Sequence, residues 1–308
     1  MLTLYTSCLL KSLVRRFALW CLLLAMVSVA QAQTQASCTF TTFALQSPAT
    51  GGKVLLPSGV NDYATVVGEA LDLNTYTTQG FTRWSNGGLS FYSVKLNGSA
   101  VDTAFADRND NGVTIGGANT PFLVQGSTFT PLTVTIGTTT HSTFLPTRMN
   151  KWGTIVGFYV DSSGTSHGFK RWSNGQGIAL DFPGAKETLP FGINDSGTIV
   201  GSYSTTLSPK HGFIYHNGQW ATLDYPSSTL QTGLRGISNA GVIIGETSAG
   251  ETFHASFIYE NSAFKVVALP NTQYPSVVSG ISLVRGLLTG WVGGFSRSDL
   301  TGFIATCN

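Results

Sequence analysis

Charged side chains are scarce in this sequence: Asp, Glu, Lys and Arg make up 10% of the 308 residues, against roughly 25% in an ordinary soluble domain. Disorder is excluded nonetheless, because disordered chains combine few aromatics with a large net charge, and this chain has 19 Phe, 10 Tyr and 6 Trp. Little charge, many aromatics and 36 glycines favour an all-β protein whose backbone is its main polar content.

Long hydrophobic runs are also missing, with one exception near the N-terminus. Phe17–Val29 is an apolar run of 13 residues, which is short of the ~20 needed to span a bilayer. Basic residues precede this run and the small residues of Ala30–Ala32 follow it, which is the pattern of a secretory signal peptide. We therefore expect residues 1–32 to be removed, leaving a secreted or periplasmic protein without a membrane span.

Net charge is nearly absent once that segment is set aside. Lys11, Arg15 and Arg16 leave with it, so Lys+Arg falls from 17 to 14 against 15 Asp+Glu, a net charge of −1. A near-neutral chain lacks the basic surface that nucleic acid requires. No nucleic-acid partner is therefore expected.

Cysteine is rare, and its placement is informative. Cys8 and Cys21 lie in the predicted signal peptide, whereas Cys38 and Cys307 remain at the two ends of the mature chain. An even pair in an oxidising compartment predicts a disulfide, and a spacing this wide is not that of a metal site.

Motifs that would indicate known chemistry are lacking as well. The sequence contains no G-x-S-x-G, H-E-x-x-H, P-loop or dinucleotide-binding pattern. Asp107–Gly112 ("DRNDNG") fits the first half of a calcium loop, but Ala118 stands where the bidentate Glu belongs. A hairpin turn explains the stretch, so neither a metal nor a cofactor is expected.

What the sequence does contain is an internal repeat, marked by two independent columns. The first is the Gly of "IVG" and its variants, at Gly68, Gly116, Gly157, Gly201, Gly245 and Gly290. The second is the Phe of "HGF" and its variants, at Phe81, Phe122, Phe169, Phe213, Phe257 and Phe303. The Gly column steps by 48, 41, 44, 44 and 45 residues. Six copies are therefore present.

Each copy divides into four strands, named A to D here. In the fourth copy we expect strand A at 189–194, B at 198–204, C at 211–216 and D at 219–225. The A–B turn runs from an Asn to a Gly, which suits a type I turn closing on a left-handed residue. The C–D turn is Asn217-Gly218, repeated as Asn86-Gly87 and Asn174-Gly175, which predicts type I′ hairpins.

A period near 44 with four strands per unit predicts a six-bladed β-propeller of antiparallel blades, forming a single domain over 33–308. The repeats are expected at approximately 55–100, 101–143, 144–188, 189–232, 233–275 and 276–308. The last copy lacks strand D, and the orphan strand at 38–45 resembles one. The N-terminal strand is therefore expected to complete the last blade, with Cys38 beside Cys307.

The stretch "GINDSGTIVGSYSTTLSPKHGFIYHNGQWATLDYP", Gly192 to Pro226, resembles the HAF-type extracellular repeat of exported bacterial proteins. The likeness covers essentially the whole mature chain, although the second and sixth copies lack the His of the triplet. It implies export and a propeller-like array of repeats. The family carries no established activity to transfer.

Strand A of each copy is expected to line the central channel, and one of its positions departs from the repeat. Two residues before the turn, four copies carry a glycine that permits close approach near the axis, namely Gly59, Gly192, Gly236 and Gly280. The second and third copies carry Asp107 and Arg148 instead. These opposite charges predict either an ion pair that fills the channel or a polar ligand site at its mouth, with Arg108 and Arg235 nearby.

The function favoured by the sequence is non-enzymatic: an exported, monomeric binding or scaffold module that recognises glycan or protein through the propeller's loop-built face. One alternative is a carbohydrate-active hydrolase or lyase with residues dispersed over the loops, because propellers assemble sites from distant segments. Another is a structural repeat protein without a small-molecule ligand. The sequence predicts no catalytic residue.

Overall fold

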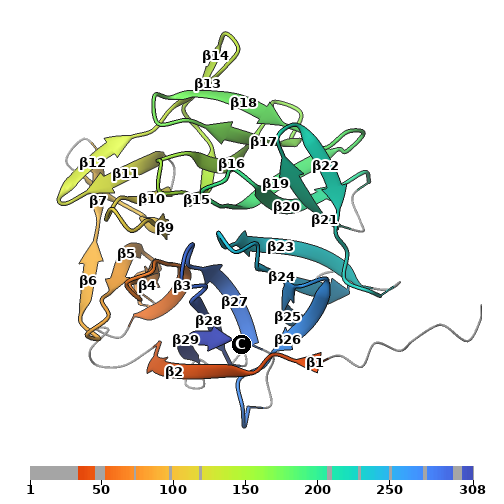
Figure 1. Ribbon diagram of the computed structural model, residues 1–308. Coiled ribbons are helices and arrows are strands. Elements are labelled where there is room, and N and C mark those ends of the chain that lie inside the picture. The colour runs from red at the N-terminus through yellow and green to blue at the C-terminus, as the bar shows by residue number, and fades with distance from the viewer. Residues whose placement is uncertain are drawn as a thin grey trace, which may run out of the picture. The chain divides into compact units, whose positions relative to one another are not determined.

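The computed structural model describes residues 34–45, 53–72, 74–96, 99–117, 120–206, 210–227, 230–249, 252–272, 276–293 and 300–307. The predicted signal peptide lies outside these ranges. The compact unit Gln35–Asn308 is all-β across its described residues, and it forms a six-bladed propeller (Figure 1). Within the same ranges, no helix has the length and apolar character to cross a membrane.

Five blades follow one another along the chain, each as an antiparallel meander of strands A to D. Blade 1 comprises β3 (Val54–Val60), β4 (Val66–Leu71), β5 (Thr78–Arg83) and β6 (Leu89–Tyr92). Blade 2 comprises β9 (Ala104–Arg108), β10 (Thr114–Gly117), β11 (Pro121–Gln125) and β12 (Thr128–Pro131). Blade 3 comprises β15 (Leu145–Met149), β16 (Ile155–Val160), β17 (Ser166–Arg171) and β18 (Gln176–Leu180). Blade 4 comprises β19 (Glu187–Ile193), β20 (Ile199–Ser204), β21 (His211–His216) and β22 (Gln219–Thr222). Blade 5 comprises β23 (Gln231–Ile237), β24 (Ile243–Ala249), β25 (Thr252–Glu260) and β26 (Ala263–Val267).

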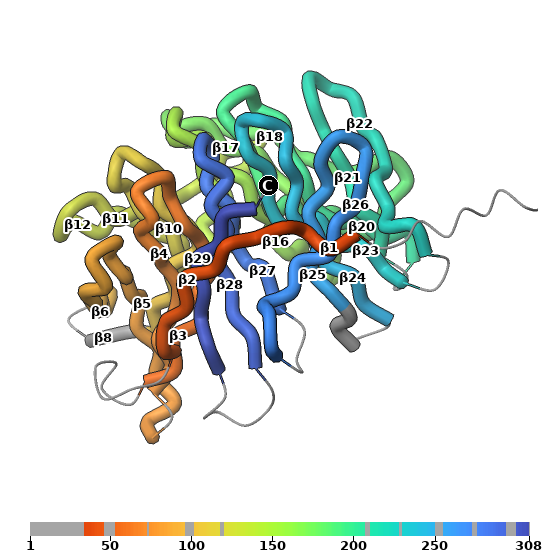
Figure 2. The backbone as a smooth tube through the Cα atoms, turned by 60° about the horizontal axis from the view of Figure 1, so that its bottom comes forward, coloured from red at the N-terminus to blue at the C-terminus, as the bar shows by residue number. Residues whose placement is uncertain are grey.

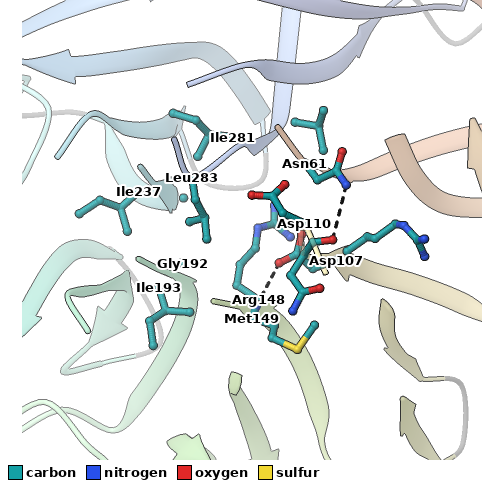
Figure 3. A pocket seen from close by; sticks show the side chains of 14 residues that line it. Asn61, Asp107, Asp110, Arg148, Met149, Gly192, Ile193, Ile237, Ile281 and Leu283 are labelled. Carbon is teal, nitrogen blue, oxygen red and sulfur yellow. Dashed lines mark hydrogen bonds between the residues drawn. The ribbon is translucent and has the colours of Figure 1, made fainter. Parts of the chain in front are cut away.

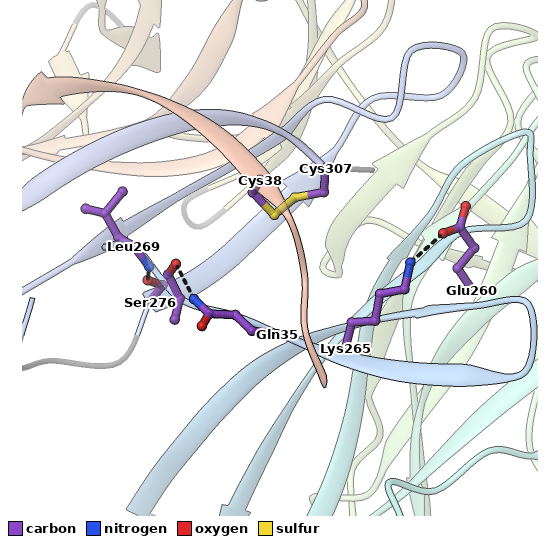
Figure 4. Close-up of a disulfide and its surroundings, with 8 residues drawn as sticks. Gln35, Cys38, Glu260, Lys265, Leu269, Ser276 and Cys307 are labelled. Carbon is purple, nitrogen blue, oxygen red and sulfur yellow. Dashed lines mark hydrogen bonds and ion pairs between the residues drawn. A yellow bond between two sulfur atoms is a disulfide. The ribbon is translucent and has the colours of Figure 1, made fainter. Parts of the chain in front are cut away.

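The sixth blade is assembled from both ends of the chain, as predicted. It comprises β27 (Ser276–Ile281), β28 (Leu288–Val292), β29 (Thr301–Cys307) and, as its outer strand, β2 (Cys38–Ala44). Figure 2 shows β2 running beside β29, and Cys38 pairs directly with Cys307 in the ladder. A disulfide joins the two cysteines (Figure 4), so the predicted closure is confirmed.

Three short additions lie outside the four-strand pattern. The hairpin β13 (Val134–Ile136) and β14 (Thr139–His141) extends blade 3, because β13 pairs in parallel with β18. The hairpin β7 (Val94–Leu96) and β8 (Ser99–Val101) precedes blade 2. The strand β1 (Thr34–Gln35) is the neighbour of β26. The repeat does not predict these elements, because each occurs once.

The two repeat markers are direct neighbours in every blade. The ladder pairs Gly68 with Phe81, Gly116 with Phe122, Gly157 with Phe169, Gly201 with Phe213, Gly245 with Phe257 and Gly290 with Phe303. In blade 4 a Cβ on Gly201 would lie 2.1 Å from the carbonyl oxygen of Leu189 and 2.7 Å from the ring of Phe213. Phe213 is 0% exposed, so its ring fills the space that the glycine leaves.

The A–B turns have the predicted conformation. In blade 4 the Gly197 N–H donates to the Asn194 carbonyl at 3.1 Å, and Gly197 has φ +82°. The Asn194 side chain accepts from the N–H of Thr198 and donates to the Ser238 carbonyl of the next blade at 3.1 Å. The turns are therefore linked to one another around the propeller axis.

The C–D turns follow the prediction at one place and depart from it at two. Asn217 and Gly218 both have positive φ, 48° and 83°, as a type I′ turn requires. At the other two sites only Gly87 and Gly175 have positive φ. The Gly87 N–H donates to the Trp84 carbonyl, so these loops are one residue longer, and the type I′ prediction is wrong there.

Candidate functional site

The inner strand of every blade contains a β-bulge at the same position. One strand A residue has no partner on strand B, namely Ser58, Ala106, Thr147, Phe191, Arg235 and Ser279 in blades 1 to 6. A bulge removes a residue from the ladder and leaves its backbone groups to find other partners. The six bulges together form a layer around the axis, which we call the bulge layer.

Arg148 satisfies four carbonyl groups of the bulge layer. Its Nη1 donates to the carbonyls of Ala106 at 3.1 Å and Thr147 at 3.0 Å. Its Nη2 donates to the carbonyls of Ser58 at 2.8 Å and of Ser279. Four inner strands therefore converge on one guanidinium, whose Nη1 and Nη2 donors are occupied. Arg148 closes the channel at this level and is not available to an anionic ligand through these atoms.

Asp107 is buried on the neighbouring strand but does not contact Arg148 as an ion pair. Its Oδ2 accepts from the N–H of Met149 at 3.0 Å, and among the ion pairs of the described residues none joins it to Arg148. Burial raises the pKa of the Asp107 carboxyl, and the charge of Arg148 opposes that rise. The expected direct ion pair is therefore wrong; the two charges influence each other across a gap.

The mouth of the channel opens among the A–B turns, on one side of Arg148 (Figure 3). The cavity volume there is about 20 Å³, which is room for one or two water molecules and not for a sugar. Asp110 lies in this mouth, and burial together with the nearby Asp62 carboxyl raises the pKa of Asp110 to about 6. The mouth therefore has room for water beside the Asp110 carboxyl, and it is too small for a sugar.

Arg108 is among the residues that line the mouth, as expected, but its guanidinium points away from it. Its Nη1 donates to the Thr114 hydroxyl at 2.8 Å, and its guanidinium lies 5.4 Å from the centre of the Trp84 ring. Arg108 thus packs outward against blade 1. Alternation along β9 separates it from the residues with which the sequence grouped it.

Arg235 is the bulge residue of blade 5, and its side chain points away from the mouth. It forms an ion pair with Glu246, a residue whose ladder partner is Gly233, near the start of β23. The mouth is instead lined by Gly236, toward the strand's end. The guanidinium also stacks 4.4 Å from the centre of the Phe191 ring. Side-chain exposures of 32% for Arg235 and 23% for Glu246 show that solvent reaches this pair.

Apolar rings lie beside this pair, and blade 1 carries a second glutamate at the repeat position that Glu246 occupies in blade 5. The Phe158 and Phe191 rings lie 6.3 Å apart, and Leu145, where β15 begins, is 48% exposed. Glu69 follows Gly68 in blade 1 as Glu246 follows Gly245 in blade 5. Burial, followed by the charge of Asp102, raises the pKa of Glu69. Two carboxyl groups in different environments therefore occupy the same repeat position in two blades.

The four predicted site residues are thus not one cluster. Asp107 and Arg148 close the axis, Arg108 packs outward, and Arg235 belongs with Glu246. The sequence did not single out Glu246 or Glu69, because the position after the "IVG" glycine varies from copy to copy and a glutamate there breaks no pattern. Over the part of the chain that the structure describes, no three His, Cys, Asp or Glu residues are grouped as metal ligands.

Neither a family model nor a curated protein sequence matches this chain, so the resemblance to the HAF-type repeat stays a prediction. The fold is nevertheless shared with a solved gluconolactonase from Xanthomonas campestris, described as important in glucose secondary metabolic pathways. The two superpose with a TM-score of 0.52 and 12% sequence identity, over 92% of this chain and 94% of the other. At this identity the likeness shows the propeller fold.

Proposed function

We propose that this protein is a carbohydrate-active hydrolase whose reacting groups are Glu246 and Arg235. The observation that carries the proposal is the partly exposed Arg235–Glu246 pair, stacked on the Phe191 ring beside the axis. A carboxylate next to an aromatic ring suits a sugar, whose hydroxyl groups need acceptors and whose C–H face packs on apolar surface. The likeness to a gluconolactonase makes a sugar lactone the first substrate to test.

The roles follow from the surroundings of Glu246. Glu246, paired with a guanidinium, takes a proton from the attacking water. Arg235 holds that carboxylate in place, and its charge stabilises negative charge that develops on the carbonyl oxygen. The protonated Glu246 then gives the proton to the leaving oxygen, so that the ester bond breaks and the carboxylate is restored.

The test is hydrolysis of glucono-lactone by the full chain. The rate of proton release is measured and compared with the rate of spontaneous hydrolysis. Replacing Glu246 with Gln should lower kcat by 100-fold or more, since general-base catalysis contributes about 10²–10⁴-fold. Glu260→Gln is the matched control, because Glu260 lies on the same blade and pairs with Lys265. Equal activity of Glu246→Gln and the parent protein would remove Glu246 from the mechanism.

The likeness to a gluconolactonase does not support the non-enzymatic binding role expected from the sequence. The parent protein and the Glu246→Gln variant distinguish the two functions. A hydrolase turns over a panel of lactones and glycosides, and loses turnover in Glu246→Gln. A binding module retains sugar without forming product, in the parent and in the variant alike.

A further inference from the structure

Two tryptophans in touching turns of blade 3 are exposed to solvent. Trp152 is the third residue of the A–B turn and is 63% exposed, and Trp172 begins the C–D turn and is 39% exposed. The two turns touch, since a Cβ on Gly153 would lie 3.5 Å from the Cβ of Ser173. Both turns lie at the end of the blade that surrounds the channel mouth, which we call the mouth face. Large apolar side chains gathered at one place on a surface mark a contact site.

The Trp152 ring is held in place although it is exposed. Its indole N–H donates to the Asp195 carbonyl of the next blade's turn at 3.2 Å. The Lys151 ammonium lies over the ring, 4.7 Å from its centre, and pairs with the Asp195 carboxylate at 3.5 Å. A ring that is already ordered loses little conformational entropy when another molecule packs against it. Trp152 is therefore a preformed flat platform.

A comparison with blade 1 shows that Trp172 is left uncovered. The sequence "RWSNG" places Trp84 in blade 1 where Trp172 stands in blade 3. Arg108 of the following blade lies over the half-buried Trp84 ring, 5.4 Å from its centre. Blade 4 carries a buried Ile193 at the position of Arg108, so no guanidinium from that position reaches Trp172. Blade 3 therefore presents both of its turn tryptophans to solvent.

From these features we infer that the mouth face of blade 3 binds a neutral polysaccharide. The C–H faces of two sugar units of one chain would pack on Trp152 and Trp172. Their hydroxyl groups would meet the polar turn residues and the Lys151 ammonium, which is 47% exposed. This surface goes beyond the proposed hydrolytic centre and does not depend on it, because the Arg235 side chain points away from the mouth.

The charges beside the two rings favour a neutral chain over an anionic partner. Lys151 is already paired with Asp195. Lys170, whose ammonium lies 5.8 Å from the centre of the Trp172 ring, has no carboxylate within ion-pairing distance among the described residues. One such lysine is too little charge to hold an anionic membrane or a nucleic acid. The neighbouring turn residues are polar, as in Ser173, so they do not form the apolar centre of a protein interface.

Depletion binding to insoluble polysaccharides tests the inference on the full chain. Cellulose, chitin and starch granules offer neutral sugar chains, a carboxymethyl-cellulose resin offers a charged one, and vesicles of phosphatidylcholine with phosphatidylglycerol offer a membrane. We expect the parent protein to be retained on at least one of the three neutral polysaccharides. Retention only on the charged resin or only on the vesicles, or no retention at all, would overturn the inference.

Single substitutions locate the surface on the polysaccharide that retains the parent protein. Trp152→Ala should weaken binding at least tenfold, and Trp172→Ala by about threefold because less of its ring is exposed. Tyr76→Ala is the matched control, because Tyr76 is 73% exposed but lies in the B–C loop of blade 1, at the end of the blade away from the mouth face. It should bind as the parent does. Circular dichroism melts check that all three variants are folded. Unchanged binding in Trp152→Ala, or an equal loss in Tyr76→Ala, contradicts the assignment.

Lactone turnover separates this inference from the proposed function. Trp152→Ala should hydrolyse glucono-lactone at the rate of the parent protein, because Trp152 lies on the mouth face and the Arg235–Glu246 pair does not. Retention on polysaccharide without turnover would remove the hydrolase and keep this surface. Turnover without retention would do the reverse.

Discussion

Blades 3 and 4 are neighbours built on the same repeat, and they differ in what they place on the axis. Blade 4 carries Gly192, where a Cβ would lie 2.7 Å from the Cα of Gly236. Blade 3 carries Arg148 at the equivalent position, and its guanidinium reaches carbonyls of four inner strands. The glycine of the repeat permits the inner strands to approach one another closely. Arg148 donates hydrogen bonds to the bulge-layer carbonyls that this close approach buries.

This difference separates two kinds of position in a repeat protein. Residues kept in every copy solve a problem that each blade has by itself, such as the bulge opposite Gly201. A residue on the axis faces all the blades at once, and a single long side chain can serve several of them. A departure from the repeat is therefore a candidate for function or for closing the ring, and in this protein Arg148 does the latter.

The largest expected loss of stability concerns the "IVG" glycine, which blades 3 and 4 share. Gly201→Ala would place a Cβ 2.1 Å from the Leu189 carbonyl oxygen, and moving a backbone group in a packed blade costs about 3 kcal/mol or more. Gly117→Ala is the control, because the nearest atom to its Cβ is 3.6 Å away. Urea unfolding measures both. Similar free energies of unfolding for the two variants would show that the bulge is not constrained by the glycine.

A second prediction converts blade 3 into the pattern of blade 4. Arg148→Gly leaves four bulge-layer carbonyls without their donor, and we expect a loss of about 3 kcal/mol, since one buried unsatisfied group costs about 1–3 kcal/mol and water can reach some of the four. Millimolar guanidinium, far below denaturing concentrations, should restore part of the melting temperature.

Arg108→Gln is the matched control for that experiment. Arg108 is an arginine on the adjacent inner strand that contacts Thr114 and Trp84 instead of the axis, so we expect a loss of under about 1 kcal/mol and no response to guanidinium. Rescue of both variants, or of neither, would contradict the role assigned to Arg148.

The smallest expected effect concerns pH and the turn of blade 2. The pKa of Asp110 is raised from 3.8 to about 6 by burial and by the Asp62 carboxyl. Folding therefore favours the protonated form, so this group's stabilising contribution is fully present below pH 4 and is lost as pH rises through about 6. Asp110→Asn should gain stability over the parent at pH 7 and not at pH 4, measured by thermal unfolding. A difference independent of pH would contradict this assignment.

Much of the fold could be predicted because the repeat supplies six observations of the same solution. Strand C of blade 4 begins at His211 and ends at His216, as expected, and the outer strand of blade 6 comes from the N-terminus. The turn at Asn86 could not be read in the same way. An Asn-Gly pair fits two hairpin loops of different length, and the flanking pairing of Trp84 with Gly88 selects the longer one.

The candidate site was less accessible to prediction. The sequence predicted a pair between Asp107 and Arg148 because the two opposite charges occupy the same repeat position on adjacent inner strands. In the structure the Asp107 carboxylate accepts from the Met149 N–H, and Arg148 donates to bulge-layer carbonyls. Arg235 was placed at the mouth, yet its position in the bulge directs it to Glu246 on the other side of the layer. A bulge has no separate signal in one copy of the sequence, since it consists of an unpaired residue of ordinary type.

By itself, the sequence determined the number of blades, the order of their strands, the closure by the N-terminal strand and the disulfide. Those features depend on turn chemistry, on strand periodicity and on a pattern repeated along the chain. Only the tertiary structure decided which charges meet. Six bulges converge on one axis, and the partner of an inward-facing group there is set by the distance between blades, which no local pattern encodes.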